Sequence, residues 1–369
     1  MNDIRSDFGR RHAGERPAHV LSMNESPYAP LPSVLRTLNS ALGRVNRYPD
    51  PTCTELALEL ARRHQVPDEH VVVGPGSLGV ARQLVRAVAA RGPGEEMIYP
   101  WRSFEGFAAL SRMTRMTGVR IPLDTAYRQD LEAMADRVTE QTRLVFLCNP
   151  NNPTGTAIAD GELRRFLDRV PERVVVVVDE AYHDYATDPA VASGVDLCHE
   201  YENLVVLKTF SVAHGLADLR VGYAIAAVPL VDLMHEQASP FAVSTLGQQA
   251  ALASLAAETE LRARIRRVVD ERGRITEGLR TMGYDVPESQ GNFVWLPLGG
   301  CSVDFALACR QAGVDVKLYP EGGVRISVGL PEANDALLDV VARTTAMCAT
   351  PAESVPGEPG SCRMCVRTV

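Results

Sequence analysis

Short runs of apolar and β-branched residues recur through the middle of the chain, and they limit the folds that it can adopt. They cover residues 71–73, 97–99, 144–148, 174–178, 204–207 and 221–226. The runs are continuous rather than alternating, which indicates strands that are buried on both faces of a mostly parallel sheet. Longer segments with helical periodicity, such as 80–90 and 163–169, lie between them. The pattern predicts a doubly wound α/β core from about residue 46 to about residue 235.

The chain of 369 residues is longer than a single hydrophobic core usually supports, so a second domain is expected. Residues 245–282 are rich in arginine and have the periodicity of a long amphipathic helix, and strand and helix patterns follow. We therefore predict a smaller α/β domain over residues 236–349, to which an arm formed by residues 1–45 contributes. Residues 350–369 are rich in Pro, Gly and Ser, which predicts a disordered tail.

Composition favours a small-molecule ligand in a reducing compartment. The net charge of -8 disfavours a nucleic-acid partner. The sequence has no apolar run long enough to span a membrane and no signal-peptide pattern, so we expect a cytoplasmic protein. The eight cysteines are scattered, as is typical of reduced thiols. Cys362 and Cys365 form a lone C-x-x-C without nearby histidines, so no metal site is predicted.

A glycine-rich turn joins one predicted strand to a helix in VVVGPGSLGVARQL, residues 71–84. The helix would begin directly after Gly76, at Ser77, and would present free backbone N–H groups and the positive end of its dipole. An anion such as a phosphate would suit this place. Similar turns also occur without any ligand, so both interpretations stay open here.

Polar residues follow two of the predicted buried strands. In CNPNNPTG (148–155) two prolines stiffen the loop, and Asn152 is the amide that we single out, although a simple turn would look similar. In VVVVVDEAYHDY (174–185) Asp179 ends a run of five valines, and Tyr182 follows three residues later. A buried carboxylate is costly unless a cation or several donors meet it. The alternative is an aspartate that caps the junction between strand and helix.

The segment LKTFSVAHGLADLRVGY, residues 207–223, carries Thr209, Ser211 and Arg220. Two hydroxyls and a guanidinium are the groups that usually hold a dianion. Phe104 is an aromatic residue that either lies flat on a ring or belongs to the core. The segment therefore indicates a second part of a phosphate site.

In their order along the chain, these motifs resemble the fold-type I pyridoxal-phosphate aminotransferases, and within them the branch of the histidinol-phosphate and aromatic amino acid aminotransferases. The resemblance also includes NESPYAP (24–30), NRYPDP (46–51), NFVWLPLG (292–299) and GVRISVG (323–329). It therefore spans nearly the whole chain and implies a large cofactor domain with a smaller α/β domain.

The resemblance implies a cofactor site built from these residues. Asp179 would pair with the pyridinium nitrogen, and Tyr182 and Asn152 would hydrogen-bond the phenolic oxygen of the ring. Phe104 would stack on the ring. The phosphate would be held by the backbone at Gly76 and Ser77 and by the side chains of Thr209, Ser211 and Arg220.

Two further roles follow from the same resemblance. Tyr48 would reach the phosphate in the neighbouring subunit, which implies a homodimer. Arg325 would bind the α-carboxylate of an amino acid or keto acid through a bidentate pair. Trp101 and Phe107 suggest tolerance for an apolar or aromatic substrate side chain.

The Schiff-base lysine of the family falls at Val212, which can neither tether the cofactor nor move a proton. The sequence has two lysines, Lys208 and Lys317, and neither occupies a suitable position. His214 has a side chain suited to proton transfer at neutral pH, so it is either a replacement base or a passively packed ring. We therefore expect pyridoxal 5'-phosphate or pyridoxamine 5'-phosphate to bind non-covalently.

Three functional hypotheses remain at this stage. The first is an enzyme with lysine-independent chemistry on an amino acid or keto acid, such as elimination, dehydration or decarboxylation, with His214 as base. The second is a non-catalytic subunit or regulator that pairs with an active homologue in a heterodimer. The third is an engineered or trapped variant of an ordinary aminotransferase.

Overall fold

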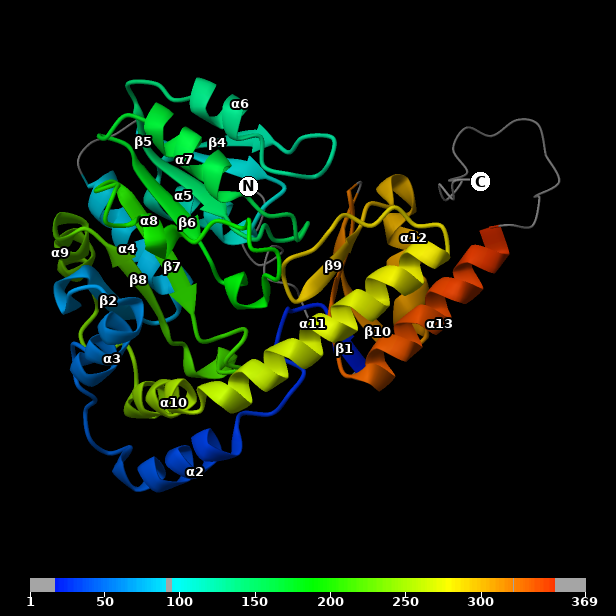
Figure 1. Ribbon diagram of the computed structural model, residues 1–369, viewed down its shortest axis with the longest axis horizontal. Coiled ribbons are helices and arrows are strands. Elements are labelled where there is room, and N and C mark those ends of the chain that lie inside the picture. The colour runs from blue at the N-terminus through cyan, green and yellow to red at the C-terminus, as the bar shows by residue number, and fades with distance from the viewer. Residues whose placement is uncertain (1–16, 91–94, 321, 349–369) are drawn as a thin grey trace.

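The computed structural model describes residues 17–90, 95–320 and 322–348 (Figure 1). Within them lie a large and a small sheet, with α11 (Glu258–Thr281) running between the two. The predicted tail, with Cys362 and Cys365, lies outside the described residues.

The large sheet has seven strands within the described ranges, in the order β2-β8-β7-β6-β5-β3-β4. Their bounds are β2 (Val71–Gly74), β3 (Glu96–Trp101), β4 (Thr117–Pro122), β5 (Thr142–Cys148), β6 (Val175–Asp179), β7 (Leu204–Thr209) and β8 (Gly222–Ala226). Pairing is parallel from β4 through β7, and β8 is antiparallel to both of its neighbours. The predicted mostly parallel α/β sheet is confirmed.

Helices cover both faces of this sheet, which explains the continuous apolar runs. Val177 packs on one face and its neighbours Val176 and Val178 on the other, and all three are fully buried. The Val177 face is covered by α4 (Ser77–Ala89), α5 (Glu105–Thr114) and α9 (Val228–Glu236). The opposite face is covered by α3 (Thr54–His64), α6 (Leu131–Asp136), α7 (Asp160–Arg169), α8 (Gly194–Leu197) and α10 (Thr245–Ala256).

The small sheet joins the two ends of the described chain. Its order is β1-β10-β11-β9, and β1 (His19–Leu21) is parallel to β10 (Val314–Tyr319). The antiparallel strands β9 (Phe293–Leu296) and β11 (Gly323–Ser327) complete it. The core beneath this sheet includes residues of α11, α12 (Ser302–Gln311) and α13 (Pro331–Cys348).

The predicted long helix over residues 245–282 is two helices. Ala257 has φ −96° and ψ 35°, which interrupts the helix between α10 and α11. Helix α10 packs against α2 (Pro32–Ala41) and shares the core of the large sheet, whereas α11 reaches the small sheet. The proposed domain boundaries stay predictions.

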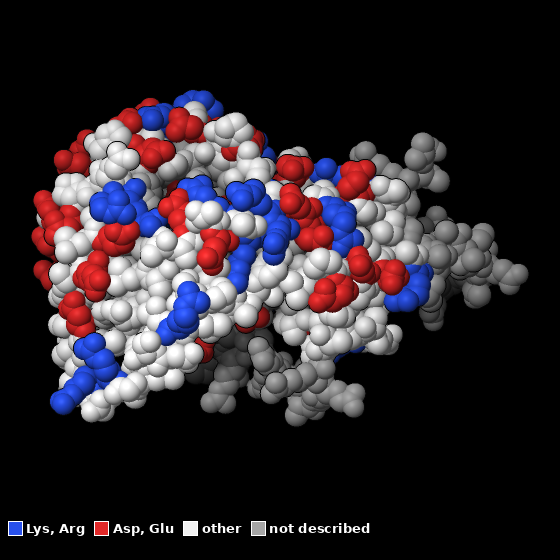
Figure 2. All heavy atoms as spheres, turned by 60° about the horizontal axis from the view of Figure 1, so that its bottom comes forward, with Lys and Arg blue, Asp and Glu red and all other residues white. Residues whose placement is uncertain are grey.

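The surface carries charges of both signs. On the face shown in Figure 2, Lys and Arg side chains are interspersed with Asp and Glu side chains. None of the helices in the described ranges combines the length and apolar character needed to cross a membrane.

Candidate active site

The carboxyl ends of neighbouring parallel strands bring the predicted polar residues together. Asp179, at the end of β6, is the Cα partner of Cys148 in β5 and of Leu207 in β7. The loop with Asn152 follows β5 directly, and Thr209 ends β7. In open α/β sheets this edge is where ligands bind.

Asp179 is a buried carboxyl group without a cationic partner among the described residues. Its side chain is 5% exposed and accepts a hydrogen bond from the backbone N–H of Ala181 at 3.1 Å. Burial raises the pKa of Asp179 to about 7, more than this hydrogen bond lowers it. The carboxyl group is therefore poised to gain from a ligand that brings a positive charge.

Tyr182 lies in a network of buried amides. The Nδ2 groups of Asn152 and Asn24 each donate to its hydroxyl oxygen at 3.1 Å. Both acceptor sites of that oxygen are thus used, so its own hydrogen is left to donate to a ligand. Burial also raises the pKa of Tyr182, which keeps the hydroxyl protonated.

Arg325 reaches this network from the small sheet. Its Nη1 donates to Oδ1 of Asn152 at 2.7 Å, and its Nη2 donates to the backbone carbonyl of Ser22. The guanidinium is buried, and its Nε has no hydrogen-bond partner among the described residues. A buried donor without a partner is costly, so this group favours an acceptor such as a carboxylate.

A second cluster forms a cradle at the start of α4. Helix α4 begins at Ser77, and its Ncap residue Gly76 has φ +78° and supplies no side-chain cap. A Cβ at Gly76 would overlap the guanidinium of Arg220, which donates to Ser211 Oγ at 3.2 Å. Ser211 N–H donates in turn to Thr209 Oγ1 at 3.1 Å. Free helix N–H groups, two hydroxyls and a guanidinium suit a dianion.

Phe104 and Val212 belong to different apolar clusters, that of the large sheet and that of the small sheet. Phe104 precedes α5, and its ring covers the Cα of Gly106, where a Cβ would collide with it. Val212 is buried in the same apolar cluster as Tyr182. Phe107, by contrast, is a buried core residue packed on Phe146, with ring centroids 4.8 Å apart.

Both lysines are engaged elsewhere. Lys208 Nζ lies 2.9 Å from Oε2 of Glu180, whose side chain is buried. Lys208 and Thr209 are neighbours on β7, so their side chains point to opposite faces of the strand. Lys317 Nζ lies 3.1 Å from Oε2 of Glu105. Neither ammonium group contacts Asp179 within the described structure.

The structure does not bring His214 to this cluster. Its Nδ1 is 2.8 Å from Oγ of Ser254 in α10, and its ring centroid is 4.5 Å from that of Phe210. The ring also lines a cavity together with Lys208. This placement argues against His214 as the base that the sequence suggested, because its side chain turns to the opposite side of β7 from Thr209.

Tyr48 also lies apart from the cluster of its own chain. It is 84% exposed, and its ring centroid is 4.9 Å from that of Phe241, which is exposed as well. An exposed aromatic pair of this kind suits contact with another molecule.

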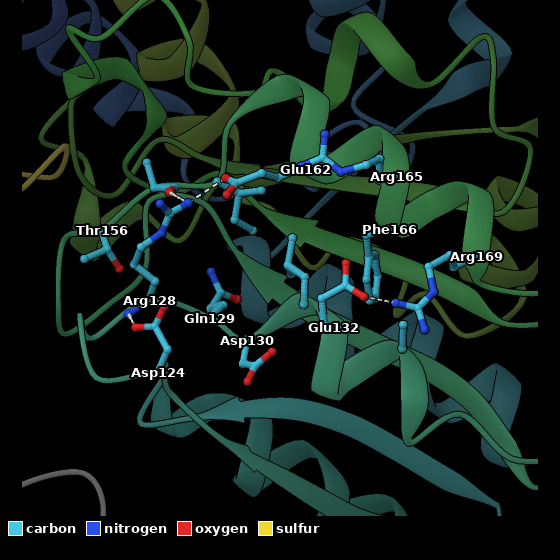
Figure 3. A pocket seen from close by; sticks show the side chains of 14 residues that line it. Asp124, Arg128, Gln129, Asp130, Glu132, Thr156, Glu162, Arg165, Phe166 and Arg169 are labelled. Carbon is cyan, nitrogen blue, oxygen red and sulfur yellow. Dashed lines mark hydrogen bonds and ion pairs between the residues drawn. The ribbon is translucent and has the colours of Figure 1, made fainter.

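A cavity of about 350 Å³ lies beside α6 and α7 and contains none of the predicted site residues (Figure 3). Two pairs of opposite charges on its walls are joined, since Arg128 lies 2.5 Å from Glu162 and Arg169 contacts Glu132. It is separate from the site at the carboxyl edge of the sheet.

Asn24 is a candidate site residue to which no role was assigned from the sequence. It has φ 55°, and its amide oxygen accepts from Ser327 Oγ at 2.8 Å, which fixes Nδ2 toward Tyr182. The signal was present in the motif NESPYAP, which begins with this residue. Its function depends on a contact with β11 that spacing along the chain does not reveal.

Comparisons with known proteins identify the family of this chain. The family model "Aminotransferase class I and II" matches residues 18–342. A protein of Streptomyces avermitilis named aromatic amino acid aminotransferase is 52% identical over 326 residues, which cover 88% of this chain and 90% of that protein. A protein of the same name from Thermobifida fusca is 52% identical over 324 residues, covering 88% of this chain and 89% of the relative.

The fold matches solved structures as well. The histidinol-phosphate aminotransferase of Sinorhizobium meliloti, solved in complex with pyridoxal-5'-phosphate, has a TM-score of 0.83 and 27% identity, covering 90% of this chain and 92% of that chain. The L-threonine-O-3-phosphate decarboxylase of Porphyromonas gingivalis shares the fold at a TM-score of 0.75 and 22% identity, covering 89% and 99% of the two chains. By its sequence and its fold, the chain belongs to the class I and II aminotransferases.

Proposed function

We propose that the chain binds pyridoxal phosphate or pyridoxamine phosphate non-covalently and uses it on an amino acid or 2-oxo acid without a lysine. The observation that carries this proposal is the buried carboxyl group of Asp179, which lacks a cationic partner among the described residues. A protonated pyridine nitrogen is the charge that this position lacks.

The residues present fit such a cofactor. Asp179 would face the ring nitrogen, the Tyr182 hydroxyl would donate to the phenolic oxygen, and Phe104 would cover the ring. The phosphate would lie at the start of α4, beside Gly76 and the guanidinium of Arg220. Gly76 has no side chain, which leaves room for that guanidinium, since a Cβ there would displace it. When bound, the cofactor supplies an electron sink for bonds to the substrate α-carbon.

The positions of the lysines favour a non-covalent mode of binding. Val212 is buried in the same apolar cluster as Tyr182, and the ammonium groups of Lys208 and Lys317 are paired with Glu180 and Glu105. Binding would therefore depend on the phosphate cradle and on Asp179.

Arg325 is the group proposed to hold the substrate. Its unpartnered Nε and its two bonded Nη groups would exchange the contacts with Asn152 and Ser22 for a substrate carboxylate. The relatives named aromatic amino acid aminotransferase favour an aromatic amino acid or its 2-oxo acid as substrate. The exposed pair of Tyr48 and Phe241 supports a homodimer in which Tyr48 completes the site of the partner.

The proton-transfer role does not pass to His214, because its ring bonds Ser254 and lines a different cavity. The Tyr182 hydroxyl oxygen accepts from two amide groups, which leaves its own hydrogen to donate. We propose that Tyr182 holds a proton at the phenolic oxygen while the substrate reacts.

An absorbance titration with each cofactor, followed by gel filtration, tests the proposal. The wild-type chain should bind a cofactor with a dissociation constant below about 100 μM and should lose it on gel filtration. Val212→Lys should keep pyridoxal phosphate through borohydride reduction and gel filtration, and it should gain transaminase activity on aromatic amino acids. Val212→Met is the matched control, because it adds a long side chain without an amine.

Three outcomes would count against the proposal or change its form. Absence of binding to the wild-type chain by either cofactor at high micromolar concentration would refute it. Covalent retention of pyridoxal phosphate by wild type would show that another amine is used. Cofactor binding without any reaction on amino or 2-oxo acids, together with co-purification of a lysine-bearing homologue, would favour a regulatory subunit.

A further inference from the structure

A cavity of about 680 Å³ opens on the side of β7 opposite to Thr209. It lies between the end of α3, the junction of α10 and α11, and strands β7 and β8. Its walls include Arg62, Arg63, His64, Asp184, Lys208, His214, Tyr223, Glu258, Leu261, Arg262, Ile265 and Arg266. None of Asp179, Asn152, Tyr182 and Arg325 lines it.

Lys208 forms part of the floor of this cavity. Its side chain is 12% exposed, and its one hydrogen bond to the described residues goes to Glu180, whose side chain is fully buried. An ammonium group has three donors, so hydrogen-bonding capacity remains at the floor.

Two histidines lie beside this lysine, and each uses one ring nitrogen. His64 Nε2 lies 2.8 Å from the hydroxyl of Tyr223, and His214 Nδ1 lies 2.8 Å from Oγ of Ser254. Burial lowers the pKa of both histidines to about 4, so both rings are neutral at physiological pH. Their second nitrogens make no hydrogen bond to the described residues and are open to a polar ligand.

Most charges at the rim already have partners. The pairs are Arg62 with Glu59, Arg63 with Glu59 and Glu258, and Arg262 with Glu258. Within the described part of the chain, Arg266 and Asp184 are the lining charges without an ion pair. Burial lowers the pKa of both histidines, and the nearby charge of Asp184 opposes this only in part. For Lys208, burial lowers the pKa, Glu180 raises it by more than any other charge, and Asp184 adds to that rise.

A ligand that complements this cavity would carry one charge of each sign and an apolar body. Arg266 offers a site for an anion, and Asp184 offers a site for a cation. Leu261 and Ile265, also on the wall, offer apolar surface. A free amino acid in its zwitterionic form has these three features at a size that the cavity accommodates.

We propose that this cavity is a second site, separate from the cofactor site, which binds a free amino acid with an apolar side chain. Its carboxylate pairs with Arg266, its ammonium group pairs with Asp184, and its side chain packs on Leu261 and Ile265. This inference does not depend on the proposed function, because none of the cofactor-site residues takes part.

Isothermal titration of the full chain with L-phenylalanine tests the second site. Arg266→Ala and Asp184→Asn should each weaken one class of binding site by at least about tenfold, because each removes a charge-assisted contact. Arg267→Ala is the matched control, since this exposed neighbour on α11 does not line the cavity, and binding should be unchanged. Phenylpyruvate lacks the ammonium group and should bind this site at least about tenfold more weakly than phenylalanine.

The same titration in an Arg325→Gln background separates the two sites. There the phenylalanine that still binds should occupy the cavity, and adding Arg266→Ala should abolish it. If the Arg325→Gln chain fails to fold, the Arg266, Asp184 and Arg267 variants of the otherwise wild-type chain test the second site. The first two should then bind one phenylalanine fewer per chain than the third. Equal binding in the Arg266, Asp184 and Arg267 variants, equal binding of phenylpyruvate, or no binding at about 10 mM phenylalanine would overturn the proposal.

Discussion

The stability of the cofactor-free protein should fall as the pH rises, and Asp179 should cause part of that fall. Burial raises the pKa of this carboxyl group from its ordinary value of 3.8 to about 7. The native state therefore holds the proton more tightly than the unfolded chain does. The contribution of protonated Asp179 to the free energy of unfolding is fully present below about pH 4, and it is lost as the pH rises through about 7. Between about pH 5 and pH 8 the loss amounts to about 2.5 kcal/mol.

Asp179→Asn isolates this contribution, because the amide does not ionise and its oxygen still accepts from Ala181 N–H. Urea unfolding at the two pH values should show that the variant gains about 2.5 kcal/mol relative to wild type on going to the higher pH. The exposed Asp232→Asn is the control for the loss of one negative charge. A relative gain for Asp179→Asn below about 0.5 kcal/mol would mean that the carboxylate meets water or a cation, and the reasoning about an unpaired buried acid would fail.

Three other substitutions test the packing around the site and the scaffold. Gly76→Ala should weaken pyridoxal phosphate binding by at least about tenfold in an absorbance titration, because its Cβ would displace Arg220, and unchanged affinity would contradict the cradle. Gly273→Ala should leave that affinity unchanged and should raise the free energy of unfolding by about 0.5–1 kcal/mol, since it lies inside α11 with no atom within 4 Å of its Cβ position. Lys208→Met should lower the free energy of unfolding by about 3–5 kcal/mol, because it leaves the Glu180 carboxylate buried and unpaired. Adding Glu180→Gln should restore most of that loss in urea unfolding, and a double variant as unstable as the single one would show that the pair is not the cause.

The sequence predicted the large sheet well because its strands carry a strong local signal. Five consecutive valines at residues 174–178 are explained by burial on both faces of β6, which the structure shows. The prediction of a single helix over residues 245–282 was wrong. Both segments favour helix, so their sequence does not mark the end of one helix and the start of the next. The interruption at Ala257 follows from packing, since α10 joins the large core and α11 reaches the small sheet.

The positions of candidate site residues at strand ends were predictable, and contacts between residues distant in sequence were not. Asp179 and Asn152 follow buried strands, so their common edge could be inferred from parallel pairing. The role of Asn24 depends on Ser327, and the orientation of His214 depends on Ser254 in a helix 40 residues away. Distance along the chain does not reveal which way a turn directs its side chains.

The parallel pairing of β1 with β10 has a consequence for folding during translation. Asn24 and Ser327, which position Tyr182 together, are separated by 303 residues. At typical rates of synthesis, roughly 15 to 60 s pass between the making of the first and the second. During that interval β1 has no strand beside it, and the amide that will orient Tyr182 has no anchor. The hydrogen bonds between Asn24 and Ser327 can therefore form only after nearly all of the chain has been translated.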